Sequence, residues 1–320
     1  MRKHFAAIAF VFFAWIVPAH ADTFPSHTIT LIVPYPPGGS TDVTGRILAD
    51  KLGAVLGQPM IVENVGGAGG SIAVGRLARS APDGYTIDIG QWDTHVGSII
   101  YNLNYNLQTD FAPIGLVSIN PQLMTARKDF PANDLEELIA WMKAHPGQAK
   151  FINQNASAQI SGLLLQKLTK TQVLFVPYRG AGPAMTDMLA GQVDLLVAQA
   201  AVLLPQIRAG AIKALVNLSP QRSAAVPDIP SSDEEGVSGL YMSGWFGLYA
   251  PKGTPADIIG KLNAAMVQVL ADPAVRKRFA DLGLDIAAPE QQTPEGLAAY
   301  TKAEIDKWWP IIKEAGIRGE

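Results

Sequence analysis

The chain has 320 residues, of which 48% are hydrophobic and 17% are charged, with 25 basic and 28 acidic side chains. This composition excludes a disordered or collagen-like chain, and the length suits two domains because a single core stops growing near about 250 to 300 residues. A mildly acidic chain without a basic block is a poor nucleic-acid binder. The sequence contains no cysteine, which excludes disulfides, thiolate catalysis and Cys-based zinc sites.

The first 21 residues have the pattern of a secretory signal peptide. Arg2 and Lys3 precede an apolar run that ends at Val17, and Ala19-His20-Ala21 fits an A-x-A cleavage site. We expect cleavage after Ala21, which leaves 23 basic and 28 acidic residues, a net charge of −5. The run is shorter than the ~20 residues of a permanent span. The expected location is the periplasm, as a soluble protein without a lipid anchor.

Strand-like apolar runs alternate with helix-period segments through the first two thirds of the chain. Strands are predicted at 29–33, 60–63, 86–89, 150–153, 172–177 and 194–198, and helices at 43–56, 134–145, 157–169 and 183–190. Ser40 or Thr41 is the expected N-cap of the first helix, with Asp42 complementing its dipole. After Thr254 the chain is predicted to be mostly helical, at 257–270, 273–282 and 295–315. The β-α-β rhythm predicts an α/β fold with parallel strands.

Two turns echo each other, since Val33-Pro34-Tyr35 and Val176-Pro177-Tyr178 are each followed by a glycine-containing loop and a helix. Ligands of open α/β sheets bind at the carboxyl ends of the strands. We therefore expect each lobe to contribute one of these turns to a shared cleft.

Three glycine-rich stretches, 34–42, 65–71 and 178–183, each lie between a strand and a helix. Backbone N–H groups at such a helix N-terminus can bind an anion, although glycines can also serve only for tight turning. Ile72 breaks the G-x-G-x-x-G pattern in the second stretch, and no Walker A motif follows any of them. A carboxylate is therefore a better candidate ligand than a nucleotide.

The sequence offers little support for catalysis. Once the signal peptide is removed, only His27, His95 and His145 remain, none at metal-ligand spacing, and no G-x-S-x-G motif is present. His95 is expected to be structural or a helix cap rather than a base. We expect no catalytic residue, no metal and no cofactor.

Polar and aromatic residues, all but Asp93 uncharged, gather near the predicted strand ends, a composition that suits a small ligand, although packing or turn formation could explain each one. Asp93 could pair with a donor or an amine of a ligand, or cap the helix that follows it. The set comprises Tyr35, Gln91, Trp92, Asp93, Asn153, Gln154, Asn155, Tyr178 and Gln199.

The chain resembles the periplasmic solute-binding proteins of tripartite tricarboxylate transporters, also called the Bug family. The motifs that carry the resemblance run in order over nearly the whole mature chain: Ile32 to Asp42, Val62-Glu63-Asn64, Pro82 to Thr86, Asp110 to Ile114, Val176 to Gly180, Gly191 to Asp194 and Trp245 to Leu248. The resemblance implies a two-lobed type II periplasmic-binding-protein fold, α/β in class, with a ligand cleft between the lobes. It places the crossings near 114–126 and 243–251, with the first lobe at 22–122 and 244–320 and the second at 123–243.

The same resemblance implies where the ligand binds. One carboxylate would meet backbone N–H groups of the first two glycine-rich turns, and the other end would meet side chains of the later loops. The implied ligand-binding residues are Tyr35, Pro37, Gly38, Gly39, Ser40, Thr41, Asp42, Ala68, Gly69, Gly70, Ser71, Trp92, Asp93, Thr94, Asn153, Gln154, Asn155, Ser157, Tyr178 and Gln199.

The chain departs from the family pattern at Asn153 to Ser157 and at Ala198-Gln199, so the distal half of the pocket is its own. Trp92 and Asp93 favour an aromatic or nitrogen-bearing carboxylate over a plain aliphatic diacid.

The leading hypothesis for function is a monomer that captures a small organic carboxylate, dicarboxylic or aromatic, by lobe closure and delivers it to the membrane permease of a tripartite tricarboxylate-type transporter. A subunit that presents its closed form to a membrane signalling kinase is the alternative. A hydrolase with His95 or Asp93 as base is a third reading without a nucleophile to support it.

Overall fold

A computed structural model describes residues 24–223, 225–314, 316 and 318, so the expected signal peptide lies outside the described residues. The strands are β1 (Ile29–Val33), β2 (Met60–Asn64), β3 (Thr86–Gln91), β4 (Phe111–Arg127), β5 (Ala149–Asn153), β6 (Val173–Pro177), β7 (Leu195–Gln199), β8 (Ile212–Asn217), β9 (Ser243–Pro251) and β10 (Asp285–Ile286). The helices are α1 (Ser40–Leu56), α2 (Ser71–Ala78), α3 (Trp92–His95), α4 (Leu135–Ala144), α5 (Ala156–Thr169), α6 (Ala181–Leu189), α7 (Ala200–Arg208), α8 (Ala256–Ala271), α9 (Pro273–Asp281) and α10 (Pro294–Glu314). Three short 3₁₀ turns lie at Ala68–Gly70, Gly97–Ile100 and Pro289–Gln291.

The predicted elements are confirmed, with boundaries shifted by a few residues at most. The residues that cap the helix ends explain this agreement. The first helix ends at Leu56 and is followed by Gly57, a left-handed C-cap whose N–H donates to Gly53 O. Asp134 caps α4 by accepting from Glu137 N, and Asp272 caps α9 ahead of Pro273.

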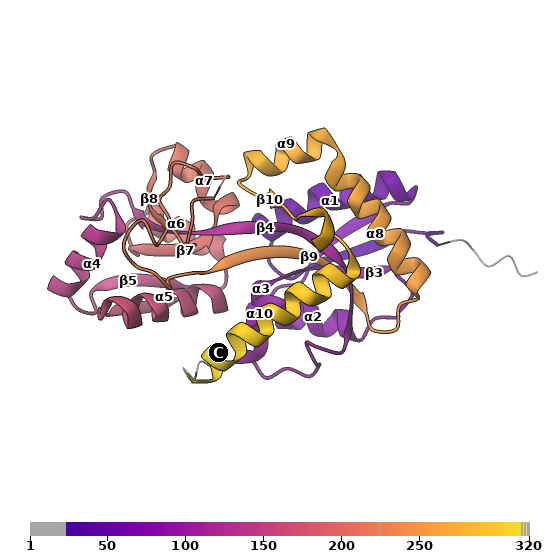
Figure 1. Ribbon diagram of the computed structural model, residues 1–320, viewed down its shortest axis with the longest axis horizontal. Coiled ribbons are helices and arrows are strands. Elements are labelled where there is room, and N and C mark those ends of the chain that lie inside the picture. Colours follow the sequence, from indigo (N-terminus) through magenta and orange to yellow (C-terminus); the bar gives the residue numbers. More distant parts are fainter. Residues whose placement is uncertain (1–23, 224, 315, 317, 319–320) are drawn as a thin grey trace, which may run out of the picture.

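The strands form two sheets joined by β4 (Figure 1). One sheet contains β2, β1, β3, β9, β10 and the first part of β4, and we call the half built on it the first lobe. The other contains the last part of β4 with β7, β8, β5 and β6, and forms the second lobe. The two expected crossing segments fall on β4 and β9, which run side by side between the halves. The lobe boundaries at 122 and 243 remain a prediction.

Strand direction differs from the simple expectation of a parallel sheet. The β1–β2, β1–β3, β5–β6 and β5–β7 pairs are parallel, as the β-α-β rhythm predicts. By contrast, β9 runs antiparallel to β3 and β4, and β4 runs antiparallel to β7 and β8. Both sheets are therefore mixed, because the segments that pass between the lobes return against the direction of the parallel strands.

Parallel strands pointing the same way bring their carboxyl ends together at one edge of each lobe. The strands are buried by apolar side chains such as Ile29, Leu31 and Val33 in the first lobe and Phe151 and Leu195 in the second, all without exposed surface. The turns after β1, β3, β5, β6 and β7 consequently lie between the two lobes, where the candidate site is found.

Candidate functional site

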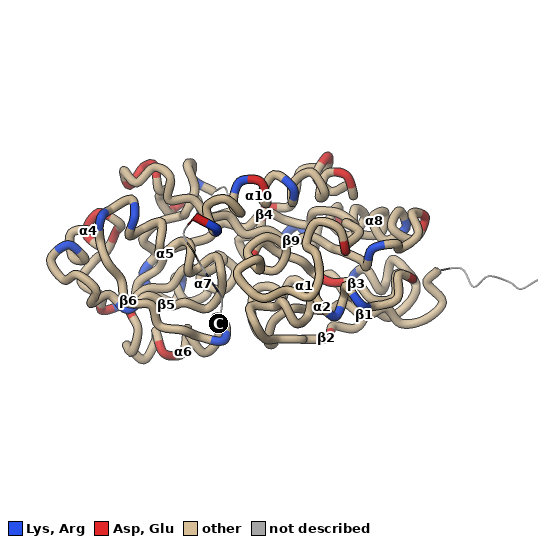
Figure 2. The backbone as a smooth tube through the Cα atoms, turned by 90° about the horizontal axis from the view of Figure 1, so that it is seen from below, with Lys and Arg blue, Asp and Glu red and all other residues tan. Residues whose placement is uncertain are grey.

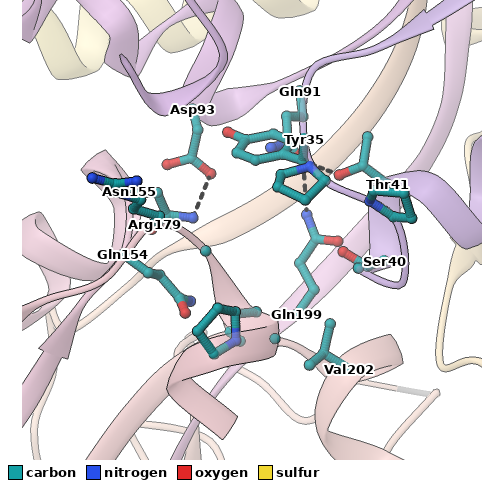
Figure 3. Close-up of a pocket in the computed structure, with 18 of the residues that line it drawn as sticks. Tyr35, Ser40, Thr41, Gln91, Asp93, Gln154, Asn155, Arg179, Gln199 and Val202 are labelled. Carbon is teal, nitrogen blue, oxygen red and sulfur yellow. Dashed lines mark hydrogen bonds between the residues drawn. The ribbon is translucent and has the colours of Figure 1, made fainter. Parts of the chain in front are cut away.

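A pocket of about 170 Å³ lies between the lobes. Figure 3 shows its side chains converging from the turns that follow β1, β3, β5, β6 and β7, and Figure 2 shows α1 on one side and α6 and α7 on the other. Both echoed turns therefore contribute to one cleft, as expected from their repetition. The lining comprises Tyr35, Pro36, Pro37, Gly39, Ser40, Thr41, Gln91, Asp93, Gln122, Gln154, Asn155, Arg179, Gly180, Ala181, Gly182, Pro183, Ala198, Gln199 and Val202.

The first-lobe wall is the N-terminus of α1. Its N-cap is Gly39, which has no side chain to accept from the first helical N–H groups, so the expected capping by Ser40 or Thr41 is wrong. The neighbouring side chains have other partners, since Thr41 donates to Gln91 Oε1 at 3.1 Å. The Asp42 carboxylate turns back onto the preceding loop and accepts from Gly38 N at 2.9 Å. The helix therefore begins at Ser40, one or two residues earlier than a cap at Ser40 or Thr41 would allow, and its first residues line the pocket.

Asp42 holds this turn in place from behind. Its carboxylate accepts from Arg46 and from Asn64 Nδ2, besides Gly38 N. Burial raises its pKa, but the hydrogen bonds from Arg46, Gly38 and Asn64 outweigh burial and hold the pKa below its usual range. Asp42 is thus an anion that shapes the loop without lining the pocket.

The second-lobe wall has two further helix N-termini without side-chain caps. Helix α6 starts after Gly180, and α7 starts after Gln199, whose side chain makes no capping hydrogen bond. Arg179 lies beside the start of α6, is exposed, and forms no ion pair with any acidic group in the part of the chain that the structure describes. Three uncapped helix N-termini and one guanidinium thus surround the pocket with positive potential.

Amide side chains connect the two lobes across the floor of the pocket. Gln91 Oε1 accepts from Thr41 and, at 3.4 Å, from Gln199 Nε2 of the second lobe. Gln154 Nε2 donates to Val197 O at 3.0 Å, which fixes the orientation of that amide. The buried oxygen Oε1 of Gln154 has no hydrogen-bond partner among the described residues.

Asp93 is the acidic residue in the pocket lining and is 3% exposed. Its carboxylate accepts from Ser157 N at 2.7 Å, from Ser157 Oγ at 3.2 Å and from Asn155 Nδ2 at 3.3 Å. Burial raises the pKa of this carboxyl to about 6, opposed by the hydrogen bonds from Ser157. A first-lobe carboxylate therefore sits on the first turn of second-lobe helix α5, and does not act as the cap of its own helix α3, whose N-cap is Gln91.

The second glycine-rich turn does not line this pocket. Tyr35 lies between it and the pocket, with its hydroxyl donating to Gly69 O at 3.0 Å. Several other residues implied by the family resemblance also lie outside the lining: Gly38, Asp42, Ala68, Gly69, Gly70, Ser71, Trp92, Thr94, Asn153, Ser157 and Tyr178.

These residues have structural contacts instead. Trp92 packs edge-on against Trp308, and Thr94 completes a capping box with Gln91. Tyr178 is not among the lining residues, and its hydroxyl donates to Asp187 Oδ2 at 2.7 Å. Ser157 contributes to the site by donating to Asp93.

Sequence reasoning missed several lining residues, chiefly Gln122, Arg179 and Val202. Arg179 follows directly on Tyr178 in a turn that was already singled out, so its position next to a predicted helix start was an available signal. Gln122 lies within β4 and Val202 within α7, where nothing in the local sequence marks a ligand-facing position.

His95 lies behind the pocket wall and does not line it. It is 1% exposed, stacks on Tyr249 at 4.1 Å, and places Nε2 3.8 Å from Asp88 Oδ2. Burial lowers the pKa of His95 to about 3 and raises that of Asp88 well above its ordinary value. His95 is therefore out of reach as a base for a ligand in the pocket.

Among the residues that the structure describes, no group of three or more His, Cys, Asp or Glu side chains is arranged to hold a metal ion. No single helix in this part of the chain is long and apolar enough to cross a membrane, and only α8 and α9 together, bent by 72° at their junction, have the length and composition to do so.

The fold and the cleft define a class, the two-lobed α/β periplasmic binding proteins. Comparison with known proteins identifies the family within this class: the sequence model of the tripartite tricarboxylate transporter family receptor matches residues 44–317. The chain belongs to this family. It is 36% identical to protein BugT of Bordetella pertussis over 306 residues, covering 94% of this chain and 93% of BugT.

Solved structures agree. MatC from Rhodopseudomonas palustris with bound malate superposes with a TM-score of 0.85 and 37% identity, covering 90% of this chain and all of that one. Periplasmic binding protein BugD superposes with a TM-score of 0.86 and 35% identity, covering 92% of this chain and 99% of BugD. An R. palustris protein with adipate superposes with a TM-score of 0.87 and 28% identity, covering 92% of this chain and 99% of that one.

Proposed function

We propose that this solute-binding protein captures a small organic carboxylate in the periplasm and delivers it to the membrane permease of a tripartite tricarboxylate-type transporter. The convergence of three uncapped helix N-termini, those of α1, α6 and α7, on one cleft supports this proposal. Each such terminus carries a partial positive charge and free N–H donors, and Arg179 adds a full charge. The malate and adipate held by two relatives are carboxylates of this kind.

Closure of the lobes is the proposed signal to the permease. A ligand that touches α1 of the first lobe and α6 and α7 of the second stabilises the arrangement in which both are close. A ligand bound to one lobe alone would leave the equilibrium between open and closed forms unchanged. The binding protein acts as a monomer in this scheme, because each chain contains a whole cleft.

The function is tested on the chain that begins at Asp22. A thermal-shift screen against aliphatic and aromatic mono- and dicarboxylates is followed by titration calorimetry of each stabilising compound. We expect at least one carboxylate to raise the melting temperature and to be recovered unchanged after incubation. If no carboxylate stabilises the protein, the anion-binding proposal is wrong, and a compound consumed over time would point to an enzyme.

Arg179→Ala tests the cationic wall. Removing this charge is expected to weaken carboxylate binding about tenfold, since a charge-assisted contact contributes about 1.5 to 3 kcal/mol. Arg276→Ala is the matched control, because Arg276 is exposed on α9 outside the pocket lining and should leave affinity unchanged. Equal affinity of both variants and the parent would place the ligand carboxylate away from Arg179.

A further inference from the structure

The helix N-termini around the pocket differ in one respect. Those of α1, α6 and α7 have no side-chain cap, whereas the first turn of α5 is occupied. Asn155 Oδ1 accepts from Ala158 N at 3.0 Å, and Asp93 Oδ1 accepts from Ser157 N at 2.7 Å. The Asp93 carboxylate therefore already occupies the first turn of α5, whereas the first turns of α1, α6 and α7 are available to an anionic ligand.

Asp93 fits the first turn of α5 as a ligand carboxylate would. Its two oxygens take a backbone N–H, the Ser157 hydroxyl and the Asn155 amide, all from the lobe opposite to Asp93 itself. These donors complement an ionised carboxylate. A second carboxylate at this end would compete for the same donors and face a like charge in a poorly solvated site.

The donors around Asp93 are already bonded to its carboxylate, and the polar atom that Gln154 leaves unpartnered is an acceptor. Gln154 is 9% exposed and lines the pocket, and its Oε1 has no partner among the described residues while its Nε2 is fixed on Val197 O. A carboxylate has no proton to give to such an oxygen, whereas an amide, an amine or a hydroxyl does. Figure 3 shows Asp93, Asn155 and Gln154 on one side of the pocket and Ser40 and Thr41 on the other.

We infer that the pocket selects monocarboxylates whose far end carries hydrogen-bond donors, because Asp93 already occupies the place of a second carboxylate on α5. This inference rests on the proposed function and makes Asp93 a specificity-determining residue. The ligand carboxylate lies among the starts of α1, α6 and α7, and its amide, amine or hydroxyl end faces Asp93 and Gln154.

The test compares ligand pairs that differ only at one end: succinate with succinamate, glutarate with glutaramate, and terephthalate with 4-carbamoylbenzoate. Calorimetry is run at pH 8, where Asp93 is ionised. In any pair that binds, we expect the monoamide to bind about tenfold or more tightly than the diacid. A diacid that binds as tightly as its monoamide, or more tightly, would overturn the inference.

Asp93→Asn removes the charge and keeps the shape. In this variant the monoamide-to-diacid affinity ratio should fall to within about threefold. Asp50→Asn is the matched control, because Asp50 is exposed on α1 outside the pocket and the substitution changes net charge equally. It should keep the parent ratio. Persistence of the full ratio in Asp93→Asn would show that Asp93 does not set the preference.

The monoamide-to-diacid affinity ratio is measured within each variant. A general loss of affinity in Asp93→Asn therefore lowers both affinities and cancels from the ratio. Should that variant fail to fold, as judged by circular dichroism, the parent comparison still decides, and Ser157→Ala, which keeps the Asp93 charge, is expected to keep the preference. Absence of stabilisation by every carboxylate in the wider screen would overturn the proposed function, whereas preference for diacids, or absence of binding by every pair while other carboxylates bind, would overturn only this inference.

Discussion

At the scale of single residues, Asp88 stands out because it is a carboxyl group inside β3 with no exposed surface. Neither of its oxygens has a hydrogen-bond partner in the described part of the chain, and its ionisable neighbour His95 lies 3.8 Å away. Burial raises the pKa of Asp88 well above its ordinary value and lowers that of His95 to about 3, so burial disfavours the charged form of both groups.

These pKa directions give the sign of a pH effect on stability. A carboxyl with a raised pKa contributes stability that is complete below its unfolded value near 3.9 and is lost as pH rises. Asp88→Asn removes this loss, so the variant should be about 1 to 3 kcal/mol more stable than the parent at pH 8, with little difference near pH 4. Urea unfolding at both pH values measures it. A less stable variant at pH 8 would instead indicate an ion pair between Asp88 and His95.

Substitutions at Gly39 and Gly70 should separate an effect on ligand binding from an effect on stability. A Cβ at Gly39 meets nothing within 4 Å and its φ is −81°, so Gly39→Val should fold normally. Its branched side chain would crowd the start of α1 and weaken carboxylate binding about tenfold or more. Unchanged affinity would count against this turn as the anion site.

The companion variant is Gly70→Ala. Gly70 has φ +93°, and a Cβ there would lie 2.6 Å from the methyl group of Thr94 and 3.1 Å from Pro34 O. We expect a loss of about 1 to 3 kcal/mol in unfolding free energy, because the backbone is strained and the space is filled. A melting temperature equal to that of the parent would contradict this.

At the scale of elements, α5 begins with a residue that serves two purposes. Asn155 caps the helix and also donates to Asp93 across the cleft. Asp134 caps α4 in the same way without a cross-lobe contact. Asn155→Ala should therefore cost more than Asp134→Ala, about 2 against about 1 kcal/mol in chemical unfolding. Equal costs would mean that the bond between Asn155 and Asp93 contributes nothing to stability.

Most elements could be predicted because glycine, proline and capping residues mark their ends, as Gly57, Asp134 and Pro273 do. Local sequence does not encode the direction of β4 and β9, since it depends on which distant strands they meet. The capping of α1 was mispredicted because Asp42 pairs with Gly38 and Arg46, a choice made by loop geometry.

The same reason limits prediction of the site. Tyr35, Thr41, Asp93 and Gln154 follow strand ends in the sequence, and topology alone brings them to the cleft. The Ala68 to Ser71 turn has the same composition as the first turn, but the Tyr35 hydroxyl on Gly69 O separates it from the pocket. Such tertiary contacts between side chain and backbone leave no pattern in the sequence.

At the scale of the whole molecule, β4 pairs with β9 through Pro121 and with β7 from Gln122 onward. One 17-residue strand thus belongs to both sheets. We expect the lobes to unfold together, so that Phe151→Ala in the second lobe, at a cost of about 3 to 5 kcal/mol, exposes β1 and β6 amides at the same denaturant concentration in hydrogen exchange. Earlier exchange of β6 alone would show independent unfolding.

The double passage of the chain between the lobes also decides how this protein could be turned into an optical reporter. Phe24 packs in the first-lobe core, and α10 is tied to the same lobe through Tyr249 with Thr301 and Trp309 with Val96. Fluorophores fused at the two ends would move with one rigid half and register no ligand. A fluorophore inserted in the exposed turn around Gly147, between α4 and β5, would travel with the other half and convert closure into energy transfer.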